Sequence, residues 1–191
     1  MSEKKRIIVC ISGASGAIYG VRTLEVLRDV SDVESHLIMS PSGAQTLAAE
    51  TDFSLDQVRD LANVSHSFKD IGASIASGSF KAAGLIVSPC SIKTLSGIAN
   101  SFADNLITRA ADVCLKERRP VVLMVRETPL HLGHLELMTK AAQFGCSIVP
   151  PVPAFYHRPK SIDDIVTQTV GRALEQLDID AGIVHRWKDE D

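Results

Sequence analysis

The stretch Ile7-Ile8-Val9-Cys10-Ile11-Ser12-Gly13-Ala14-Ser15-Gly16-Ala17 passes from an unbroken apolar run into a turn of small residues. Apolar residues at helical spacing follow the turn, at Ile18, Val21, Leu24 and Leu27. This order predicts a buried strand, a tight turn and a helix. Gly13 and Gly16 allow the backbone to approach a ligand closely, and we expect Ser12 or Ser15 to cap the helix.

The turn has the composition of an anion site, because the free N–H groups and the positive dipole end of a helix favour negative charge. It is not a dinucleotide-binding turn, since only Gly13 and Gly16 are present, and no Gly-Lys-Ser/Thr follows as in a Walker P-loop. Two interpretations stay open at this point. The turn binds a phosphate, or its small residues only let the helix pack against the sheet.

The rest of the chain repeats the order of strand and helix. We expect further strands at 35–39, 83–89, 120–125 and 147–149, and helices at 41–50, 53–62, from near 94, at 105–116, 130–144 and 161–177. The polar segment 63–81 is expected to be mostly loop with a short helical turn, and Pro89 is expected to end its strand. Because the strands are continuous apolar runs, they predict an α/β fold with a parallel sheet covered on both faces. We expect residues 1–191 to form a single domain.

Composition excludes several classes of function. The net charge of −3 gives no electrostatic case for nucleic acid or an acidic membrane surface. No apolar run approaches the roughly 20 residues of a membrane span, and no secretory segment opens the chain. The four cysteines are scattered through apolar segments without a C-x-x-C pair, which is typical of core residues in a reducing cytoplasm.

Polar residues follow the predicted strands where ligands bind in such a sheet, beyond the carboxyl ends. They are Gly13-Ala14-Ser15, Ser40, Ser91-Ile92-Lys93-Thr94, Arg126-Glu127 and, after the last strand, Tyr156. Each serine alone is best interpreted as a helix cap, and Arg126 alone as half of a solvated ion pair. Together, these hydroxyls, backbone donors and a cation favour a phosphorylated, nucleotide-like ligand over a metal ion.

Other polar residues allow two interpretations each. His131 and His134 lie three residues apart on a helix, but without a third ligand a capping or surface role is favoured over a metal site. Tyr156, in a proline-bounded loop, is either a rigid ligand contact or a packing residue. Arg172 lies on a partly apolar helix face and needs a carboxylate or an anion as its partner.

The motifs of the chain resemble those of the UbiX flavin prenyltransferases, a family formerly named 3-octaprenyl-4-hydroxybenzoate carboxy-lyase or phenylacrylic acid decarboxylase. The motifs occur in the family's order and cover almost the whole chain. They are Gly13-Ala14-Ser15-Gly16-Ala17, Glu50-Thr51-Asp52, Pro89-Cys90-Ser91-Ile92-Lys93-Thr94-Leu95-Ser96-Gly97, Arg109-Ala110-Ala111-Asp112-Val113, Leu115-Lys116-Glu117-Arg118-Arg119-Pro120, Arg126-Glu127-Thr128-Pro129 and Phe155-Tyr156-His157.

The resemblance implies a flavodoxin-like three-layer sandwich with a parallel sheet, of the flavoprotein cysteine-decarboxylase type, assembled as trimers that form a dodecamer. It implies FMN, in its reduced form, as the acceptor substrate. The dimethylallyl group of dimethylallyl phosphate is joined to N5 and C6 of the flavin without a metal ion. The product, prenylated FMN, serves a UbiD-type decarboxylase in ubiquinone biosynthesis.

The resemblance also implies roles for particular residues. The positions that match FMN contacts are Gly13, Ala14, Ser15, Ser40, Ser91, Ile92, Lys93, Thr94 and Arg126. Those that match the dimethylallyl phosphate site are Lys116, Glu127, Tyr156 and Arg172, and Arg126 adds a further cation for the leaving phosphate. The expected catalytic residues are Ser15 and Glu50, which handle protons, with Lys116 and Glu127. We expect burial near the flavin to raise the pKa of Glu50 toward neutral pH.

One segment departs from the family pattern. Pro41-Ser42-Gly43 follows Ser40 where the family commonly has Lys-Ala-Ala, so a role for that lysine does not carry over. Two alternatives to the prenyltransferase remain: an FMN-dependent decarboxylase of a 4-hydroxybenzoate or phenylacrylate type of acid, and a non-catalytic flavin-binding protein. The prenyltransferase needs a second phosphate site, whereas a simple FMN binder does not. The residues proposed for that site, which would distinguish the hypotheses, are Lys116, Glu127, Tyr156 and Arg172.

Overall fold

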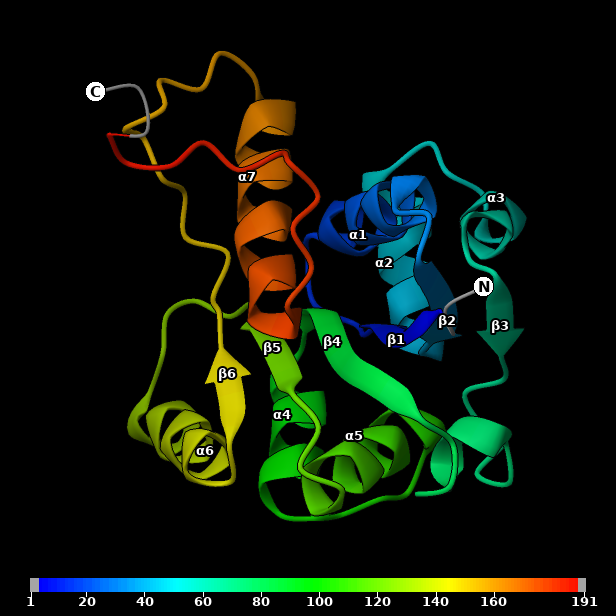
Figure 1. Ribbon diagram of the computed structural model, residues 1–191. Coiled ribbons are helices and arrows are strands. Elements are labelled where there is room, and N and C mark those ends of the chain that lie inside the picture. The colour runs from blue at the N-terminus through cyan, green and yellow to red at the C-terminus, as the bar shows by residue number, and fades with distance from the viewer. Residues whose placement is uncertain (1–3, 189–191) are drawn as a thin grey trace.

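In residues 4–188, the part of the chain that the computed structural model describes, six strands form one sheet in the order β3-β2-β1-β4-β5-β6 (Figure 1). All neighbouring strands run parallel, which confirms the predicted α/β fold. Without the short edge strand β3, the order is that of a flavodoxin-like sheet. The strands are β1 (Lys5–Ile11), β2 (Val33–Met39), β3 (Val64–His66), β4 (Ala82–Cys90), β5 (Val121–Val125) and β6 (Cys146–Ile148).

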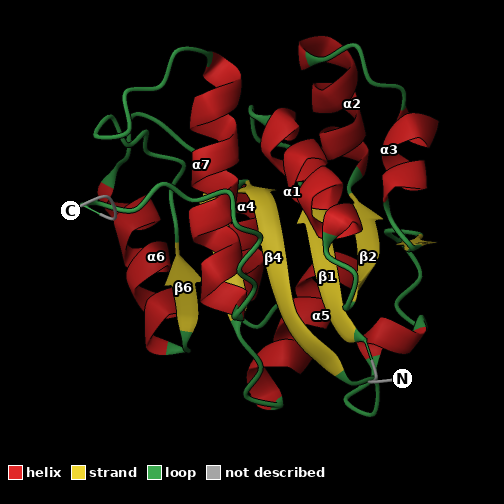
Figure 2. Ribbon diagram, turned by 45° about the horizontal axis from the view of Figure 1, so that its top comes forward, coloured by secondary structure: helices red, strands yellow, loops and turns green. Residues whose placement is uncertain are grey.

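Helices cover both faces of the sheet, as expected for a three-layer sandwich (Figure 2). One core cluster joins the sheet to α1 (Ala17–Asp29), α2 (Pro41–Glu50), α3 (Leu55–Leu61) and α7 (Ile162–Leu174). The other joins the opposite face to α4 (Ile92–Ala99), α5 (Leu106–Lys116), α6 (Leu132–Gln143) and the 3-10 turn η1 (Ser74–Ala76). A second 3-10 turn, η2 (Glu175–Leu177), continues α7.

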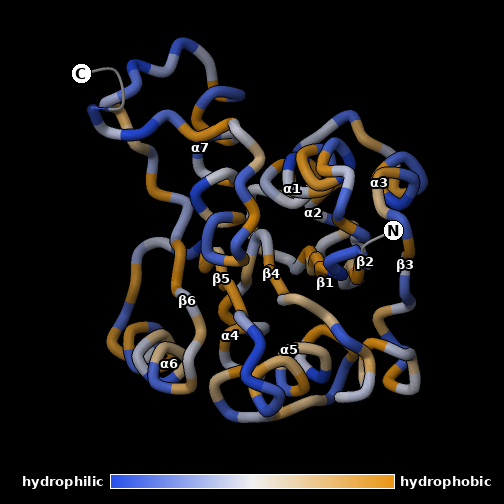
Figure 3. The backbone as a smooth tube through the Cα atoms, in the orientation of Figure 1, coloured by the Kyte–Doolittle hydropathy of each residue, from blue (hydrophilic) through white to orange (hydrophobic). Residues whose placement is uncertain are grey.

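The central strands are apolar throughout because their side chains alternate between the two cores. Ile7, Val9 and Ile11 of β1 belong to one cluster, whereas Ile8 and Cys10 belong to the other. The apolar stretches of the backbone therefore run along the strands, in orange in Figure 3. A sheet buried on both sides leaves its carboxyl edge as the natural place for polar groups.

The chain changes direction across the sheet between β1 and β4. It builds outward from β1 through β2 to β3 and then returns to place β4 against the other side of β1. The Ser12 hydroxyl joins the two strand ends, since it donates to the Pro89 carbonyl over 2.8 Å and accepts from the Ser91 N–H over 2.8 Å. Such a switch point opens a crevice at the carboxyl edge, where doubly wound proteins bind ligands.

Two strand predictions are wrong in detail. Segment 63–81, expected to be mostly loop with a short helical turn, contains that turn as η1 but also β3, whose Val64–His66 pairs with β2. Such an edge strand needs backbone pairing but no apolar run, so the sequence gives no signal for it. Pro89 does not end β4, which continues to Cys90 through a register shift after Val87 that accommodates the missing N–H.

Several helix starts also differ from expectation. Helices α3 and α6 begin at Leu55 and Leu132, each two residues after the predicted start. Helix α4 begins at Ile92, before the predicted Thr94, because the Ser91 hydroxyl accepts from the Thr94 N–H as an N-cap. Helix α1 is capped by neither Ser12 nor Ser15: its N-cap position is Gly16, which adopts a φ of 97° and offers no side chain. The caps predicted for α2, α3 and α7, at Ser40, Ser54 and Ser161, are confirmed.

No helix in residues 4–188 is long and apolar enough to cross a membrane. All four cysteines are buried as free thiols within the core, in agreement with their predicted role as small core residues.

The close packing of α1 on the sheet gives the first prediction. A Cβ at Gly20 would lie 2.4 Å from the Ser88 carbonyl oxygen and 2.6 Å from Ile11 Cγ1. Alanine favours a helix over glycine by about 1 kcal/mol, but a clash with backbone is costlier, so we expect Gly20→Ala to lower the free energy of unfolding by roughly 1–3 kcal/mol.

Urea denaturation followed by circular dichroism measures this change. Gly72→Ala is the matched control, because its nearest neighbour would be Asp70 Oδ1 at 3.5 Å, an ordinary contact. Unchanged stability in Gly20→Ala would contradict the packing described.

Candidate active site

A cavity of about 810 Å³ opens at the carboxyl edge beside the switch point. The ends of β1, β2 and β4 contribute to it, together with the starts of α2, α4 and α5. Its lining brings together five of the predicted FMN contacts with residues that the sequence did not single out. It consists of Gly13, Ser40, Pro41, Ser42, Phe68, Ser91, Lys93, Thr94, Ser96, Gly97, Asn100, Phe102, Asp104, Asn105 and Thr108.

Three helix N-termini converge on this cavity. The capping side chains are Ser40 for α2, Ser91 for α4 and Asn105 for α5, which accept from backbone N–H groups over 2.9, 3.3 and 3.1 Å. The serines are therefore caps, as each one alone suggested, and they also line a shared cavity. Positive dipole ends, unused backbone donors and the Lys93 ammonium make this region favourable for a phosphate.

The cavity also has an apolar part. Phe68 and Phe102 lie in its wall, and Phe102 is 64% exposed although it is a large apolar side chain. Gly97 lets α4 pack closely on α5 at this wall, since a Cβ there would lie 2.8 Å from Thr108 Cγ2. Apolar walls beside an anion site fit a ligand with a flat aromatic ring system and a phosphate, which is the chemistry of FMN.

A second cluster at the same edge centres on Glu50, the last residue of α2. Its carboxylate accepts from the Gly16 N–H over 2.7 Å and from the Ala17 N–H over 3.1 Å. Glu50 therefore supplies the cap that α1 lacks. Burial raises the pKa of Glu50, but hydrogen bonds from Ser15, Gly16 and Ala17 and the charge of Arg126 outweigh it and hold this pKa below its ordinary value.

The predicted pairing of Ser15 with Glu50 thus appears in the structure as a hydrogen bond. The predicted rise in the pKa of Glu50 concerns a carboxylate buried beside the flavin and stays a prediction. The C-terminal end of α2 disfavours the charge of Glu50, but the N-terminal end of α1 lies against the same carboxylate and favours it.

Arg126 and Tyr19 complete this second cluster. Arg126 follows β5, and its N–H donates to the Cys90 carbonyl over 3.0 Å. Burial raises the pKa of Tyr19, and the charge of Arg126 opposes that rise. Tyr19 was not predicted as a site residue, although it lies three residues after Gly16, in the first turn of α1.

The residues predicted to hold a second phosphate do not line the cavity of their own chain. Lys116 ends α5 and pairs with Glu117 over 2.6 Å, while the start of α5 lines the cavity. The 11-residue helix separates the two ends by about 16 Å. Arg172 lies in the last turn of α7 and finds the predicted carboxylate partner in Glu175.

Tyr156 and Glu127 also lie outside the lining of the cavity. The Tyr156 hydroxyl donates to the His185 carbonyl over 3.0 Å and accepts from Gln168 Nε2 over 3.1 Å. Glu127 is exposed, and its carboxylate accepts from the Thr128 N–H over 3.0 Å. Ala14, Ser15, Ile92 and Arg126 are likewise at the carboxyl edge but not in the cavity wall.

The predicted capping role of the histidine pair is confirmed for His131. His131 is the N-cap, and its Nδ1 accepts from the Gly133 N–H over 3.1 Å. Within the described part of the chain, no group of three or more histidine, cysteine, aspartate or glutamate side chains has the arrangement of a metal site.

The Glu50 cap gives a pH-dependent prediction. A carboxylate whose pKa is depressed by folding stabilises the protein above its unfolded pKa, and that contribution is lost as the pH falls through the folded pKa. We expect Glu50→Gln to lower the free energy of unfolding by roughly 0.5–1 kcal/mol at neutral pH. The difference from the parent should shrink below the ordinary value of 4.5.

Urea midpoints measured across the acidic range test this, with Glu136→Gln on the exposed face of α6 as the control. A Glu50→Gln difference that grew on acidification would contradict the assignment.

Comparison with known proteins finds relatives along almost the whole chain. The Flavoprotein family matches residues 1–174. The flavin prenyltransferase UbiX of Escherichia coli strain K12 is 63% identical over 186 residues, which are 96% of this chain and 98% of that protein. The crystal structure of AnUbiX (PadA1) in complex with FMN and dimethylallyl pyrophosphate has a TM-score of 0.96 at 46% identity, over 99% of this chain and 100% of that one.

A dodecameric FMN-dependent UbiX-like decarboxylase from Escherichia coli O157:H7 has a TM-score of 0.94 at 46% identity, over 96% of this chain and 99% of that one. The similarity extends over almost the whole chain, and it confirms the family suggested by the motifs. The chain belongs to the flavoprotein family and, within it, to the UbiX flavin prenyltransferases.

Proposed function

We propose that the protein joins the dimethylallyl group of dimethylallyl phosphate to N5 and C6 of reduced FMN, and so makes prenylated FMN. The observation that carries this proposal is the carboxyl-edge cavity, where three helix N-termini and Lys93 meet two phenylalanines. The relative AnUbiX was crystallised with FMN and dimethylallyl pyrophosphate, which supports both the acceptor and the class of donor.

Residues at the ends of β1, β2, β4 and β5 would hold the flavin. They are Gly13, Ala14, Ser15, Ser40, Ser91, Ile92, Lys93, Thr94 and Arg126, of which Gly13, Ser40, Ser91, Lys93 and Thr94 line the cavity. When bound, FMN supplies the nucleophilic ring atoms that accept the prenyl group. The protein's own residues orient it, hold the phosphates and move protons.

The acceptor ring must lose a proton, and Glu50 is the proposed base. Its low pKa keeps the carboxylate ionised at neutral pH, so it is ready to accept a proton. Ser15, hydrogen-bonded to this carboxylate, would pass protons between it and the substrate.

The donor site would be completed by neighbouring copies of the chain. Lys116, Glu127, Tyr156 and Arg172 do not line the cavity of their own chain, and Lys116 and Arg172 lie at the ends of α5 and α7. In an oligomer of trimers that form a dodecamer, these side chains can enter a neighbour's cavity and add cations for the leaving phosphate. The dodecameric UbiX-like relative supports this assembly.

The same relative is described as a decarboxylase, so direct decarboxylation of a phenylacrylate type of acid is the second candidate function. A decarboxylase of that kind requires no prenyl phosphate. The two candidates therefore differ in whether flavin mass changes or carbon dioxide is released.

The cellular role follows from the product. We propose that residues 1–191 act as a single flavoprotein domain in the cytoplasm, where a reducing environment suits four unpaired cysteines. Prenylated FMN would be delivered to a UbiD-type decarboxylase in ubiquinone biosynthesis.

Incubation with reduced FMN and dimethylallyl phosphate, followed by mass spectrometry of the extracted flavin, tests the proposal. We expect flavin heavier by one prenyl unit, formed without added metal. In Glu50→Gln, with FMN still bound, we expect the bond to N5 to form but ring closure at C6 to slow by about 10²–10⁴-fold, which the absorbance of the flavin reports because the two adducts have the same mass. Parallel reactions with the diphosphate identify the preferred donor.

The control is Glu136→Gln, which we expect to react at the parent rate. Unmodified flavin together with carbon dioxide release from a phenylacrylate would favour the second candidate. A normal yield of the product closed at both N5 and C6 from Glu50→Gln would exclude Glu50 as the base.

A further inference from the structure

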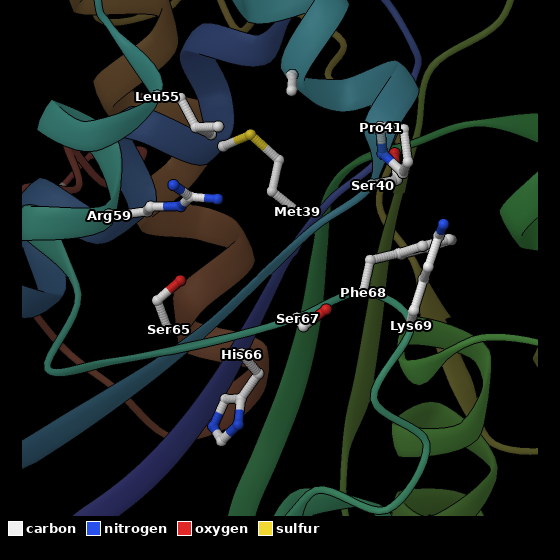
Figure 4. Close-up of a pocket in the computed structure, with 11 residues that line it drawn as sticks. Met39, Ser40, Pro41, Leu55, Arg59, Ser65, His66, Ser67, Phe68 and Lys69 are labelled. Carbon is white, nitrogen blue, oxygen red and sulfur yellow. The ribbon is translucent and has the colours of Figure 1, made fainter.

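A second cavity, of about 500 Å³, lies where α2 and α3 face β3 and the segment after it (Figure 4). It shares Ser40, Pro41 and Phe68 with the carboxyl-edge cavity, so the two are neighbours across one wall. Its remaining lining residues are not used by the proposed reaction. They are Met39, Ala44, Leu55, Arg59, Ser65, His66, Ser67 and Lys69.

The cavity is positively charged. Arg59 and Lys69 both line it, and no aspartate or glutamate is among the lining residues. Arg59 forms an ion pair with Asp56 over 3.1 Å, but the two side chains are 50% and 85% exposed, so the pair is weak. An anion in the cavity could therefore bind the Arg59 guanidinium, and little free energy would be lost if the pair with Asp56 broke.

His66 borders the cavity from β3, but its imidazole turns to the opposite face of the sheet. It pairs in register with Ile38, whose side chain belongs to the core cluster of α4 and α5, whereas α2 and α3 cover the other face. On that opposite face His66 Nε2 lies 2.9 Å from His36 Nδ1, and the two rings stack. The His66 ring therefore takes no part in binding a ligand in this cavity.

The cavity combines this polar set with apolar surface. Figure 4 shows Arg59 and Lys69 on opposite sides, with the Met39 side chain between them and Leu55 close to its end. Ser65 and Ser67 add hydroxyls that can donate to an anion. The cationic Arg59 side of the cavity, next to the apolar surface of Met39 and Leu55, matches a small molecule with an anionic head and a short hydrocarbon body.

We propose that this cavity is a second ligand site, which binds a small organic phosphate with a short apolar chain beside the flavin site. The phosphate is held by Arg59 with the Ser65 hydroxyl, and the chain packs on Met39, Leu55 and Phe68. The site exists within one chain and does not depend on the proposed prenyl transfer.

Isothermal titration of the FMN-saturated protein with isopentyl phosphate, an unreactive saturated probe, tests the proposal. We expect two binding events per chain. Arg59→Gln should weaken one of them by about tenfold or more, because a hydrogen bond to a charged group is lost, whereas Lys69→Gln, at the other side of the cavity, should weaken the same event less. Arg28→Gln, with the same charge change at the exposed end of α1, is the control and should leave both unchanged.

Arg172→Ala separates this site from the proposed donor site. If prenyl transfer is wrong, Arg172→Ala changes no binding event, while the event sensitive to Arg59 remains. The absence of any binding event that Arg59→Gln weakens would overturn the second site, whatever the reaction.

Discussion

The parallel sheet imposes the constraint on which the rest of the structure depends. Because each strand points the same way, the helices that follow β1, β2, β4 and β5 begin at one edge, and their positive dipole ends face the same space. Side-chain caps satisfy some of the free N–H groups there, at Ser40, Ser91 and Asn105. The remaining donors can be satisfied by an anionic ligand, which links the fold directly to phosphate binding.

Helix α1 differs from the other helices at this edge, because a carboxylate from another helix caps it. The turn before it is built from small residues, so α1 has no capping side chain of its own, and Glu50 of α2 supplies the carboxylate. A residue in this position has two tasks that oppose each other. Its hydrogen bonds stabilise the ionised form, whereas service as a base requires it to take up a proton. A ligand that buries Glu50 would shift this balance, because desolvation favours the neutral acid.

Much of the fold could be predicted because its signals are local. The apolar run before Gly13 predicted a buried strand, and Ser40, Ser54 and Ser161 marked helix starts that the structure confirms. The strand β3 could not be predicted, since its stability comes from pairing with β2 and not from its own side chains. The cap of α1 was missed for the same reason, as Gly16 and Glu50 are 34 residues apart in sequence.

The site residues also fall into those with a local sequence signal and those without one. Gly13, Ser40, Ser91, Lys93 and Thr94 were predicted from their place after strands, and they meet in one cavity. Phe68, Phe102 and Tyr19 gave no signal, because an aromatic residue outside a motif looks like core. The role of Lys116, Tyr156 and Arg172 at a phosphate site came from the motif resemblance, and none of the three lines the cavity of its own chain.

The central claim is that the convergent helix N-termini at the carboxyl edge hold the phosphate of FMN. A crystal structure of the protein grown with FMN tests it most directly. The account predicts flavin density in the cavity at the ends of β1, β2 and β4, with the phosphate at the N-terminus of α2, α4 or α5. Flavin bound at the amino edge of the sheet, or a phosphate remote from these three helix starts, would contradict it.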